Sequence, residues 1–280
     1  MNLWGGKLLP HPSGSSEGTK RGGAGERLAA GRDSFAVALD LLSRAASVCV
    51  LTGAGISTDS GISDFRGPQG LWTRDPSAAK LSTLSHYLGS RQARVETWRL
   101  RAQSTAAPAQ PNSGHRALVD LEHRGRLQLL VTQNVDGLHL AAGTSVDKLV
   151  ELHGSLREYR CLSCDTVGPM AEVLERVRAG DDDPSCQVCG GILKSAAISF
   201  GQRLPAEAIE RAQAAAHSCE VLLTVGTRLQ VFPAAELPAV ALAGGAKLVI
   251  VNQEATRYDR LAAAVIRAPI SQVLPAVLAT

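Results

Sequence analysis

Short, continuous apolar runs recur along the chain, and each is followed by polar or glycine residues. Runs of this kind, bounded by turn residues, are typical of strands that are buried on both faces of a parallel sheet. Helical patterns separate them, as in residues 206–216. The alternation of strand and helix predicts an α/β fold with a parallel sheet. The predicted strands are residues 48–51, 127–131, 221–225 and 248–251.

A helical pattern leads into the first predicted strand. Phe35, Ala38 and Leu42 recur at helical spacing. Asp33 or Ser34 can cap the start of this helix, because a short polar side chain accepts a hydrogen bond from the first free backbone N–H groups. We therefore expect a helix that begins near Asp33.

Residues 1–32 carry no helical or strand period and are rich in glycine and serine. Such composition cannot bury enough apolar surface to offset the entropy of ordering, so we interpret these residues as a disordered tail. A targeting peptide is the less favoured interpretation, because Glu17, Glu26 and the many glycines weaken an amphipathic helix.

The bulk composition is that of an ordinary globular protein. The chain has 280 residues, of which 45% are hydrophobic, and a formal net charge of +3. No apolar run approaches the ~18 residues needed to span a bilayer. We expect a soluble, cytoplasmic protein without a membrane or nucleic-acid partner, and the sequence leaves the oligomeric state open.

Two segments interrupt the strand and helix alternation. Residues 67–111 begin as a loop and continue with helical material, so we expect them to cover the site as part of the large domain. Residues 157–194 hold paired cysteines and too few large apolar residues for a core of their own. The predicted large domain is therefore discontinuous and consists of residues 33–156 and 195–280.

Four cysteines form two Cys-x-x-Cys pairs separated by residues 165–185. This spacing resembles that of zinc ribbons, in which four thiolates bind one ion in a closed tetrahedron that has no position left for catalysis. We therefore predict one structural zinc ion rather than disulfides. Cys49 and Cys219 lie in or near apolar runs and are interpreted as core residues. The predicted ligands are Cys161, Cys164, Cys186 and Cys189.

A glycine-rich turn, residues 53–57, follows the first predicted strand. Glycines let a backbone approach a phosphate, and the start of the next helix offers amide donors. Thr58 stands where the dinucleotide fingerprint has its third glycine, so the turn alone is equally compatible with a plain loop. No acidic residue clearly ends the second strand to hold a ribose, which disfavours an ordinary dehydrogenase.

Further motifs follow this turn in a characteristic order, and together they resemble the sirtuin family over residues 35–275. The segments Thr-Gln-Asn-Val-Asp-Gly and Leu-His-Gly are the most specific. The motifs are residues 53–57, 61–67, 132–139, 152–154, the two cysteine pairs, and residues 200–201, 226–227 and 251–252.

The resemblance implies a Rossmann-like sheet with helices on both faces, a small inserted zinc domain, and a cleft for NAD and an acyl-lysine peptide. The implied activity is NAD-dependent deacylation of protein lysines, with deacetylation favoured. The acyl group passes to ADP-ribose and nicotinamide is released. His153 matches the general base, a role that suits a side chain with a reference pKa of ~6.5. Asn134 matches a residue near the reacting ribose.

The resemblance also implies the residues that bind the two substrates. The implied cofactor-binding residues are Gly53, Ala54, Gly55, Ser57, Asp64, Phe65, Arg66, Gln133, Asn134, Asp136, Gly226, Thr227 and Asn252. The implied peptide-binding residues are Ile198, Phe200 and Gly201, along which the peptide lies as an added strand. We expect His139 to support the site.

Trp98 and Arg101 lie where relatives that remove acidic acyl groups have Tyr-x-x-Arg. They are candidates for a pocket that binds succinyl or malonyl groups, and packing on a helix is an equal alternative. Three positions depart from the family pattern: Ser63 replaces a proline, Gln202 a glutamate and Arg228 a serine.

Two other functions stay open at this point. An ADP-ribosyltransferase would use the same NAD site, and a catalytically silent scaffold would be favoured only if His153 or Asn134 were absent.

Overall fold

The computed structural model describes residues 24–64, 67, 70–75, 82–103 and 109–279. Its centre is a six-stranded parallel sheet with the strand order β3-β2-β1-β7-β8-β9. The bounds are β1 Val48–Thr52, β2 Leu127–Thr132, β3 Leu149–Glu151, β7 Val221–Val225, β8 Lys247–Val251 and β9 Ala264–Ile266.

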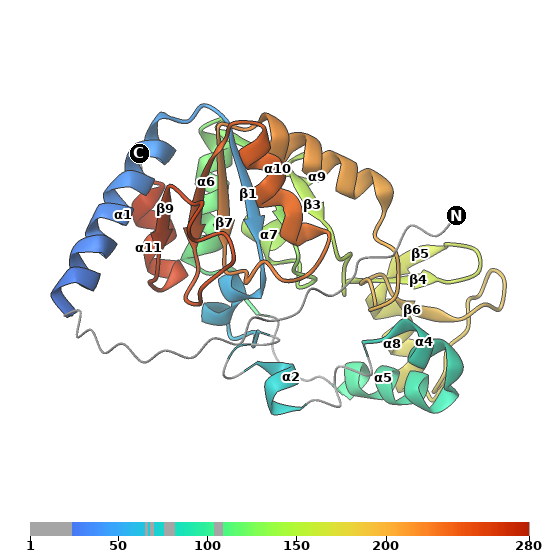
Figure 1. Cartoon of the computed structure of the whole chain (residues 1–280). Helices are drawn as coiled ribbons and strands as arrows, with labels where there is room; N and C mark the ends of the chain where they lie inside the picture. The colour runs from blue at the N-terminus through green and yellow to red at the C-terminus, as the bar shows by residue number, and fades with distance from the viewer. Residues whose placement is uncertain (1–23, 65–66, 68–69, 76–81, 104–108, 280) are drawn as a thin grey trace, which may run out of the picture.

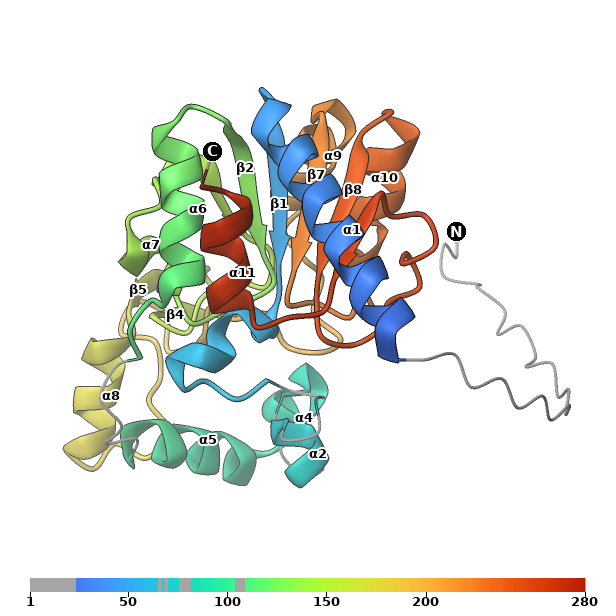
Figure 2. The ribbon, with the colours of Figure 1, turned by 90° about the vertical axis from the view of Figure 1, so that its left-hand side faces the viewer.

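Helices cover both faces of this sheet and form a three-layer domain (Figures 1 and 2). Alternate residues of β1 contribute to the two cores, with Val48 and Val50 on one side and Cys49 and Leu51 on the other. The α/β fold predicted from the apolar runs is therefore confirmed. The first face packs against α1 Ala24–Arg44, α6 Ser113–His123 and α11 Ile270–Val277, and the second against α9 Ala206–Ser218 and α10 Leu237–Ala243.

A smaller lobe lies below the carboxyl ends of the large sheet in Figure 1. Its three-stranded antiparallel sheet has the order β5-β4-β6. Helix α8 packs against β4 and β5, α5 packs against α8 and α4, and the short α2 lies below the large sheet in Figure 1. The bounds are β4 Glu158–Cys161, β5 Val167–Pro169, β6 Leu193–Ser195, α2 Leu71–Arg74, α4 Leu84–Gly89, α5 Arg91–Gln103 and α8 Met170–Arg178.

Helix α5 belongs to the core of the small lobe, although the sequence assigned residues 67–111 to the large domain. Trp98 of α5 packs with Met170, Val173 and Leu193, and with two of the cysteines. The cysteine module has few large apolar residues of its own, so it buries its apolar side against this helix.

Several elements differ from the sequence prediction. Helix α1 begins at Ala24, earlier than the expected start at Asp33, so the predicted tail of residues 1–32 is partly helical. The run Ala24–Ala30 contains good helix formers, and these extend the helix. Residues 1–23 lie outside the described residues. The short strands β3 and β9 were not predicted. The remaining elements are η1 Ala54–Ser60, α7 Leu138–Ala142, η2 Val146–Lys148 and η3 Ala234–Glu236.

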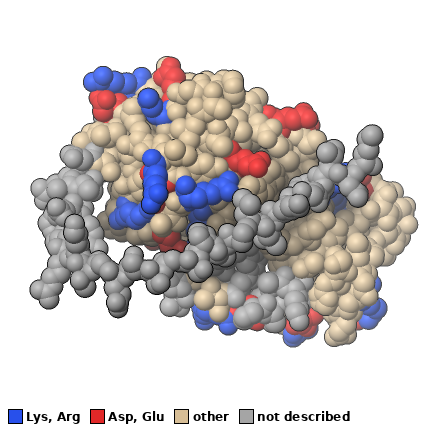
Figure 3. Space-filling model, in the orientation of Figure 1, with Lys and Arg blue, Asp and Glu red and all other residues tan. Residues whose placement is uncertain are grey.

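Within the described residues, no helix has both the length and the apolar character required to cross a bilayer. On the face shown in Figure 3, basic and acidic side chains lie in small groups of both signs.

Candidate active site

The loops after β1 and β7 are in direct backbone contact at the centre of the sheet. The N–H of Gly55 donates to the carbonyl oxygen of Gly226 at 2.9 Å, and that of Gly53 to Val225 at 3.0 Å. A Cβ atom at Gly55 would lie 2.7 Å from the Cα of Gly226, so a side chain cannot fit there. The glycine turn is therefore required by the meeting of two loops at the point where ligands bind to open parallel sheets.

Polar side chains connect the ends of three strands at this edge. Gln133 Nε2 donates to Thr227 Oγ1 at 2.9 Å, which ties β2 to β7. Asn134, only 6% exposed, donates from Nδ2 to Ser57 Oγ at 3.1 Å. Ser57 Oγ in turn donates to Asp136 Oδ2 at 2.7 Å. The structure thus brings these predicted cofactor residues together in two hydrogen-bonded sets at one edge of the sheet.

Asn252 lies at the carboxyl end of β8, where its Nδ2 donates to the carbonyl oxygen of Glu254 at 2.8 Å. The neighbouring Arg228 pairs with Glu254, with Nε 2.9 Å from Oε2, and both side chains are about one-third exposed. Arg228 is therefore held at the carboxyl edge of the large sheet by an acidic side chain.

His153 follows β3, and its imidazole is fixed by the loop after β2. Its Nδ1 lies 3.0 Å from the carbonyl oxygen of Gln133. A carbonyl can only accept, so Nδ1 carries the hydrogen and Nε2 keeps a free lone pair in the neutral ring. Burial lowers the pKa of His153, and the bond to Gln133 partly offsets that effect. His153 is therefore in the form that accepts a proton at neutral pH.

A buried hydrogen-bond network supports the backbone of Asn134. His139 Nε2 lies 2.9 Å from Thr52 Oγ1, which donates to Thr132 Oγ1 at 2.8 Å. Thr132 Oγ1 also accepts from the backbone N–H of Asn134 at 3.0 Å. Burial lowers the pKa of His139 to about 3, so the ring is uncharged. This placement fits the supporting role expected for His139.

Sequence reasoning missed Thr52 and included Thr132 only within the motif of residues 132–139, without a role in the site. A usable signal was present, because each is a polar residue that ends an apolar strand at the edge where ligands bind.

The segment predicted to carry the peptide lies beside His153. The N–H of Ile198 donates to the carbonyl oxygen of His153 at 2.7 Å. Phe200 is 42% exposed, and its backbone N–H and C=O pair with Ser82 and Leu84 at 2.8 and 3.0 Å. The segment is therefore held between the loop that carries His153, here called the histidine loop, and the start of α4.

The next residues form a turn. Gly201 has a φ of 85°, which favours glycine. Gln202 Oε1 accepts from the N–H of Ser199 at 3.2 Å, so this departure from the family pattern keeps a hydrogen bond without a negative charge.

In the loop after η1, Asp64 Oδ1 accepts from the N–H of Gly67 at 3.1 Å, and Ser63 is exposed. Phe65 and Arg66 lie outside the described residues. Among the residues that the structure describes, no hydrogen bond links the Ser63 side chain to the other site residues.

Trp98 and Arg101 occupy different surroundings. Trp98 has no exposed surface and lies in the core of the small lobe. Arg101 is half-buried, donates to Ser195 Oγ at 3.0 Å and lies over the Trp98 ring at 5.7 Å. Burial lowers the pKa of Arg101. The position of Trp98 favours the packing alternative, whereas a role for Arg101 toward an acyl group stays a prediction.

The four predicted zinc ligands converge in the small lobe, with their sulfur atoms all within 4.8 Å of one another. The Sγ atoms of Cys161 and Cys189 are 3.5 Å apart, and those of Cys164 and Cys186 are 3.7 Å apart. A tetrahedral ion with Zn–S bonds of ~2.3 Å would separate its sulfurs by about 3.8 Å. The geometry therefore fits one closed four-sulfur zinc site.

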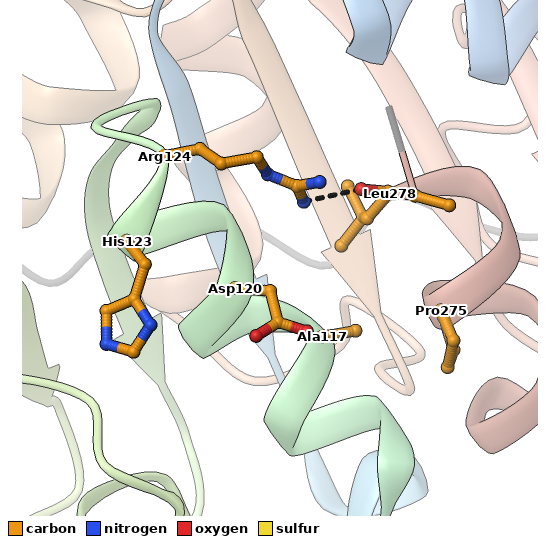
Figure 4. Close-up of a pocket in the computed structure, with 7 residues that line it drawn as sticks. Ala117, Asp120, His123, Arg124, Pro275 and Leu278 are labelled. Atoms are coloured by element: carbon orange, nitrogen blue, oxygen red, sulfur yellow. Dashed lines mark hydrogen bonds between the residues drawn. The ribbon is translucent and has the colours of Figure 1, made fainter.

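A surface hollow of about 390 Å³ lies between α6 and α11 (Figure 4). Arg124 donates there to the carbonyl oxygen of Leu278. Because α6 leads directly into the start of β2, this hollow lies at the amino ends of the strands, away from the site.

The fold and the site define a nucleotide-binding α/β protein with an inserted four-cysteine metal module. The model of the Sir2 family matches residues 53–233, and the chain belongs to this family. The chain is 53% identical over 231 residues to NAD-dependent protein deacetylase 2 of Streptomyces coelicolor, which covers 82% of this chain and 96% of the relative.

Solved Sir2 structures have the same fold. One, described as a structural basis for the mechanism and regulation of Sir2 enzymes, has a TM-score of 0.78 at 35% identity and covers 89% of this chain and 97% of that one. A complex of Sir2 with a p53 peptide and NAD⁺ has a TM-score of 0.75 at 32% identity and covers 86% of this chain and 95% of that one.

Proposed function

We propose that this chain is an NAD-dependent protein-lysine deacetylase that transfers the acyl group to ADP-ribose and releases nicotinamide. The name of the Streptomyces relative and the Sir2 complex with peptide and NAD⁺ support this activity. One observation carries the proposal: His153 has a fixed neutral tautomer and lies beside Ile198, at the same edge as the buried Asn134.

The residues at this edge suit a dinucleotide. The paired turns at Gly53, Gly55 and Gly226 bring backbone amides close to the switch point of the sheet, where a pyrophosphate is bound by N–H groups. Asn134 and Asp136 lie next to them and offer an amide and a carboxylate to a ribose or a carboxamide. NAD supplies the ribosyl group that receives the acyl group.

His153 acts as the general base. Its Nδ1 stays bonded to the Gln133 carbonyl oxygen. After the acyl-lysine oxygen has displaced nicotinamide from the ribose, Nε2 of His153 takes a proton from a ribose hydroxyl. The lowered pKa of His153 keeps this nitrogen unprotonated at neutral pH. The ring can later return the proton to the departing amine, which leaves His153 unchanged.

The peptide adds to the segment Ile198–Gly201, next to His153, through backbone hydrogen bonds. The zinc ion is structural, because a closed set of four thiolates leaves no position for a substrate. The small lobe then helps to form the cleft and supplies no catalytic group.

Mass spectrometry tests the activity. The protein is incubated with NAD and matched acetyl-lysine and succinyl-lysine peptides. Loss of the acetyl mass from the peptide together with formation of acetyl-ADP-ribose is the expected result. A peptide that instead gains the mass of ADP-ribose would identify an ADP-ribosyltransferase, and unchanged NAD and peptides would contradict both enzymes.

Acetyl groups are the favoured acyl class, because Trp98 is fully buried and Arg101 is engaged with Ser195. Desuccinylation or demalonylation is the alternative specificity, and we expect deacetylation to be at least comparable. The cytoplasmic location stays a prediction.

A further inference from the structure

Lys194, the middle residue of β6, is a buried cation of the small lobe and is only 4% exposed. Its ammonium donates to the carbonyl oxygen of Ser195 at 2.7 Å and to that of Ala197. No ion pair joins Lys194 to a carboxylate in the part of the chain that the structure describes. Two carbonyl oxygens of one short segment therefore satisfy this charge.

Loss of these two hydrogen bonds would be energetically costly in these surroundings. Burial, together with the positive charges of Arg101 and Arg160, lowers the pKa of Lys194 to about 8. A buried charge without hydrogen bonds is strongly destabilising. The segment after β6 is therefore held close to the ammonium.

The peptide group between Ala197 and Ile198 is held at both ends. Its carbonyl oxygen accepts from Lys194, and its N–H donates to the carbonyl oxygen of His153 at 2.7 Å. A peptide group is planar, so fixing one end orients the other. A Cβ atom at Gly154 would lie 2.3 Å from the carbonyl oxygen of Ala196, so the histidine loop packs directly on this segment.

We infer that Lys194 is a positioning residue for His153 and that it acts through the peptide group between Ala197 and Ile198. The ring of His153 is held by Gln133 in the large domain, while its backbone is held by this peptide group. Loss of the ammonium frees the peptide group and lets His153 Nε2 move relative to the hydroxyl that it deprotonates. The inference rests on the proposed role of His153 as the base.

The test compares Lys194→Met with Lys247→Met, a control at an exposed lysine that begins β8. For Lys194→Met we expect kcat for an acetyl-lysine peptide to fall about 10–100-fold, because small displacements of catalytic groups have costs of that size. The KM for the peptide should not change. Lys194→Arg, which keeps a charged donor, should recover most of the activity.

Nicotinamide exchange separates positioning from a general loss of structure. In the proposed reaction His153 takes its proton only after nicotinamide has left, so exchange should stay close to the wild-type rate in Lys194→Met. Equal losses of exchange and deacetylation would overturn the inference. A raised peptide KM with unchanged kcat would also overturn it, because Lys194 would then act on the peptide segment.

Histidine NMR of the protein without NAD gives an independent measurement, with His153→Ala identifying the His153 signal. The signal should shift in Lys194→Met and not in Lys247→Met, and an unchanged signal in folded Lys194→Met contradicts the inference. Thermal melting and zinc content establish folding. If Lys194→Met does not fold, Lys194→Gln, which keeps a neutral donor, is measured in its place. If the wild type neither exchanges nicotinamide nor deacetylates the peptide, the proposed function fails. The NMR signal of His153 still tests whether Lys194 positions His153.

Discussion

The two sheets of this protein are stabilised in different ways. In the large sheet, every residue of β1 and β7 is buried, and helices cover both faces. In the small sheet, β4 buries only Cys161 and β5 buries none of its residues. The large domain thus has an extensive apolar core, whereas the small lobe packs two of its cysteines against Trp98 from a separate helix. We expect zinc binding by the four cysteines to supply the rest of its stability.

The same contrast applies to the chemistry. Asn134 and Asp136 stand at the end of a deeply buried strand, which fixes them to a rigid support. The small lobe contributes instead a connecting segment, residues 195–198, in which the N–H of Ile198 donates to the carbonyl oxygen of His153 and the carbonyl oxygen of Ala197 accepts from Lys194. Substitutions in the large domain should therefore remove catalytic groups, whereas substitutions in the small lobe should displace those groups from their positions.

The largest expected effect is that of His153→Ala. We expect deacetylation to fall by ~10²–10⁴, the usual contribution of a general base, with little change in melting temperature. Steady-state rates and thermal melting measure both quantities. Turnover close to wild type would show that another group is the base.

Cys186→Ser tests the dependence of the small lobe on zinc. We expect about one zinc ion per chain in the wild type and loss of that ion in the variant, because thiolate binding is coupled to local folding. Hydrogen exchange should then increase in β4, β6 and α8, while β1 and β7 stay protected. Activity should fall indirectly.

Two outcomes would contradict the contrast between the sheets. Pure wild-type protein that contains no zinc and keeps its stability with a chelator would show that the small lobe folds without metal. Equal loss of protection in β1 and β4 would show that the two sheets unfold together.

The sequence predicted the large sheet well, because continuous apolar runs are specific to strands buried on both faces. The strand Val221–Val225 has the predicted bounds, and the first strand ends at Thr52, one residue beyond the predicted end. Strands β3 and β9 have three residues each, too few to give a period. The helical pattern around Trp98 indicated a helix but could not show which core the helix would join.

The candidate site could be predicted only in part. The motifs identify the residues that end β1, β2 and β7, and the cysteine spacing identifies the metal cluster. The neutral tautomer of His153 depends on a carbonyl oxygen of Gln133, which sequence does not reveal. The burial of Lys194 likewise depends on tertiary packing, since a lysine among apolar residues is usually exposed.

A smaller effect is expected for Arg101→Met in the small lobe. Arg101 donates one hydrogen bond to Ser195 and lies over Trp98, so its loss should change the deacetylation rate by about tenfold or less. Parallel rates with acetyl-lysine and succinyl-lysine peptides measure this effect. A strong preference of the wild type for succinyl-lysine, abolished in Arg101→Met, would instead make Arg101 the acyl-binding residue.

Arg228→Ser, at the rim of the large domain, should have the smallest effect. The Arg228 guanidinium pairs with Glu254 beside Asn252, and both charged side chains are about one-third exposed. Exposed ion pairs contribute ~0–1 kcal/mol, so the Kd for NAD should change by less than about fivefold in either direction. The backbone turns at Gly53 and Gly226 stay in place in the variant and can still bind the nucleotide.

Calorimetric titration of NAD into the wild type and Arg228→Ser measures this difference, with Arg260→Ser as a control at an exposed arginine. If Arg228→Ser binds NAD more than about tenfold tighter, equivalent to ~1.4 kcal/mol, Arg228 obstructs the site. The ion pair with Glu254 would then hold the guanidinium in the path of the nucleotide rather than beside it.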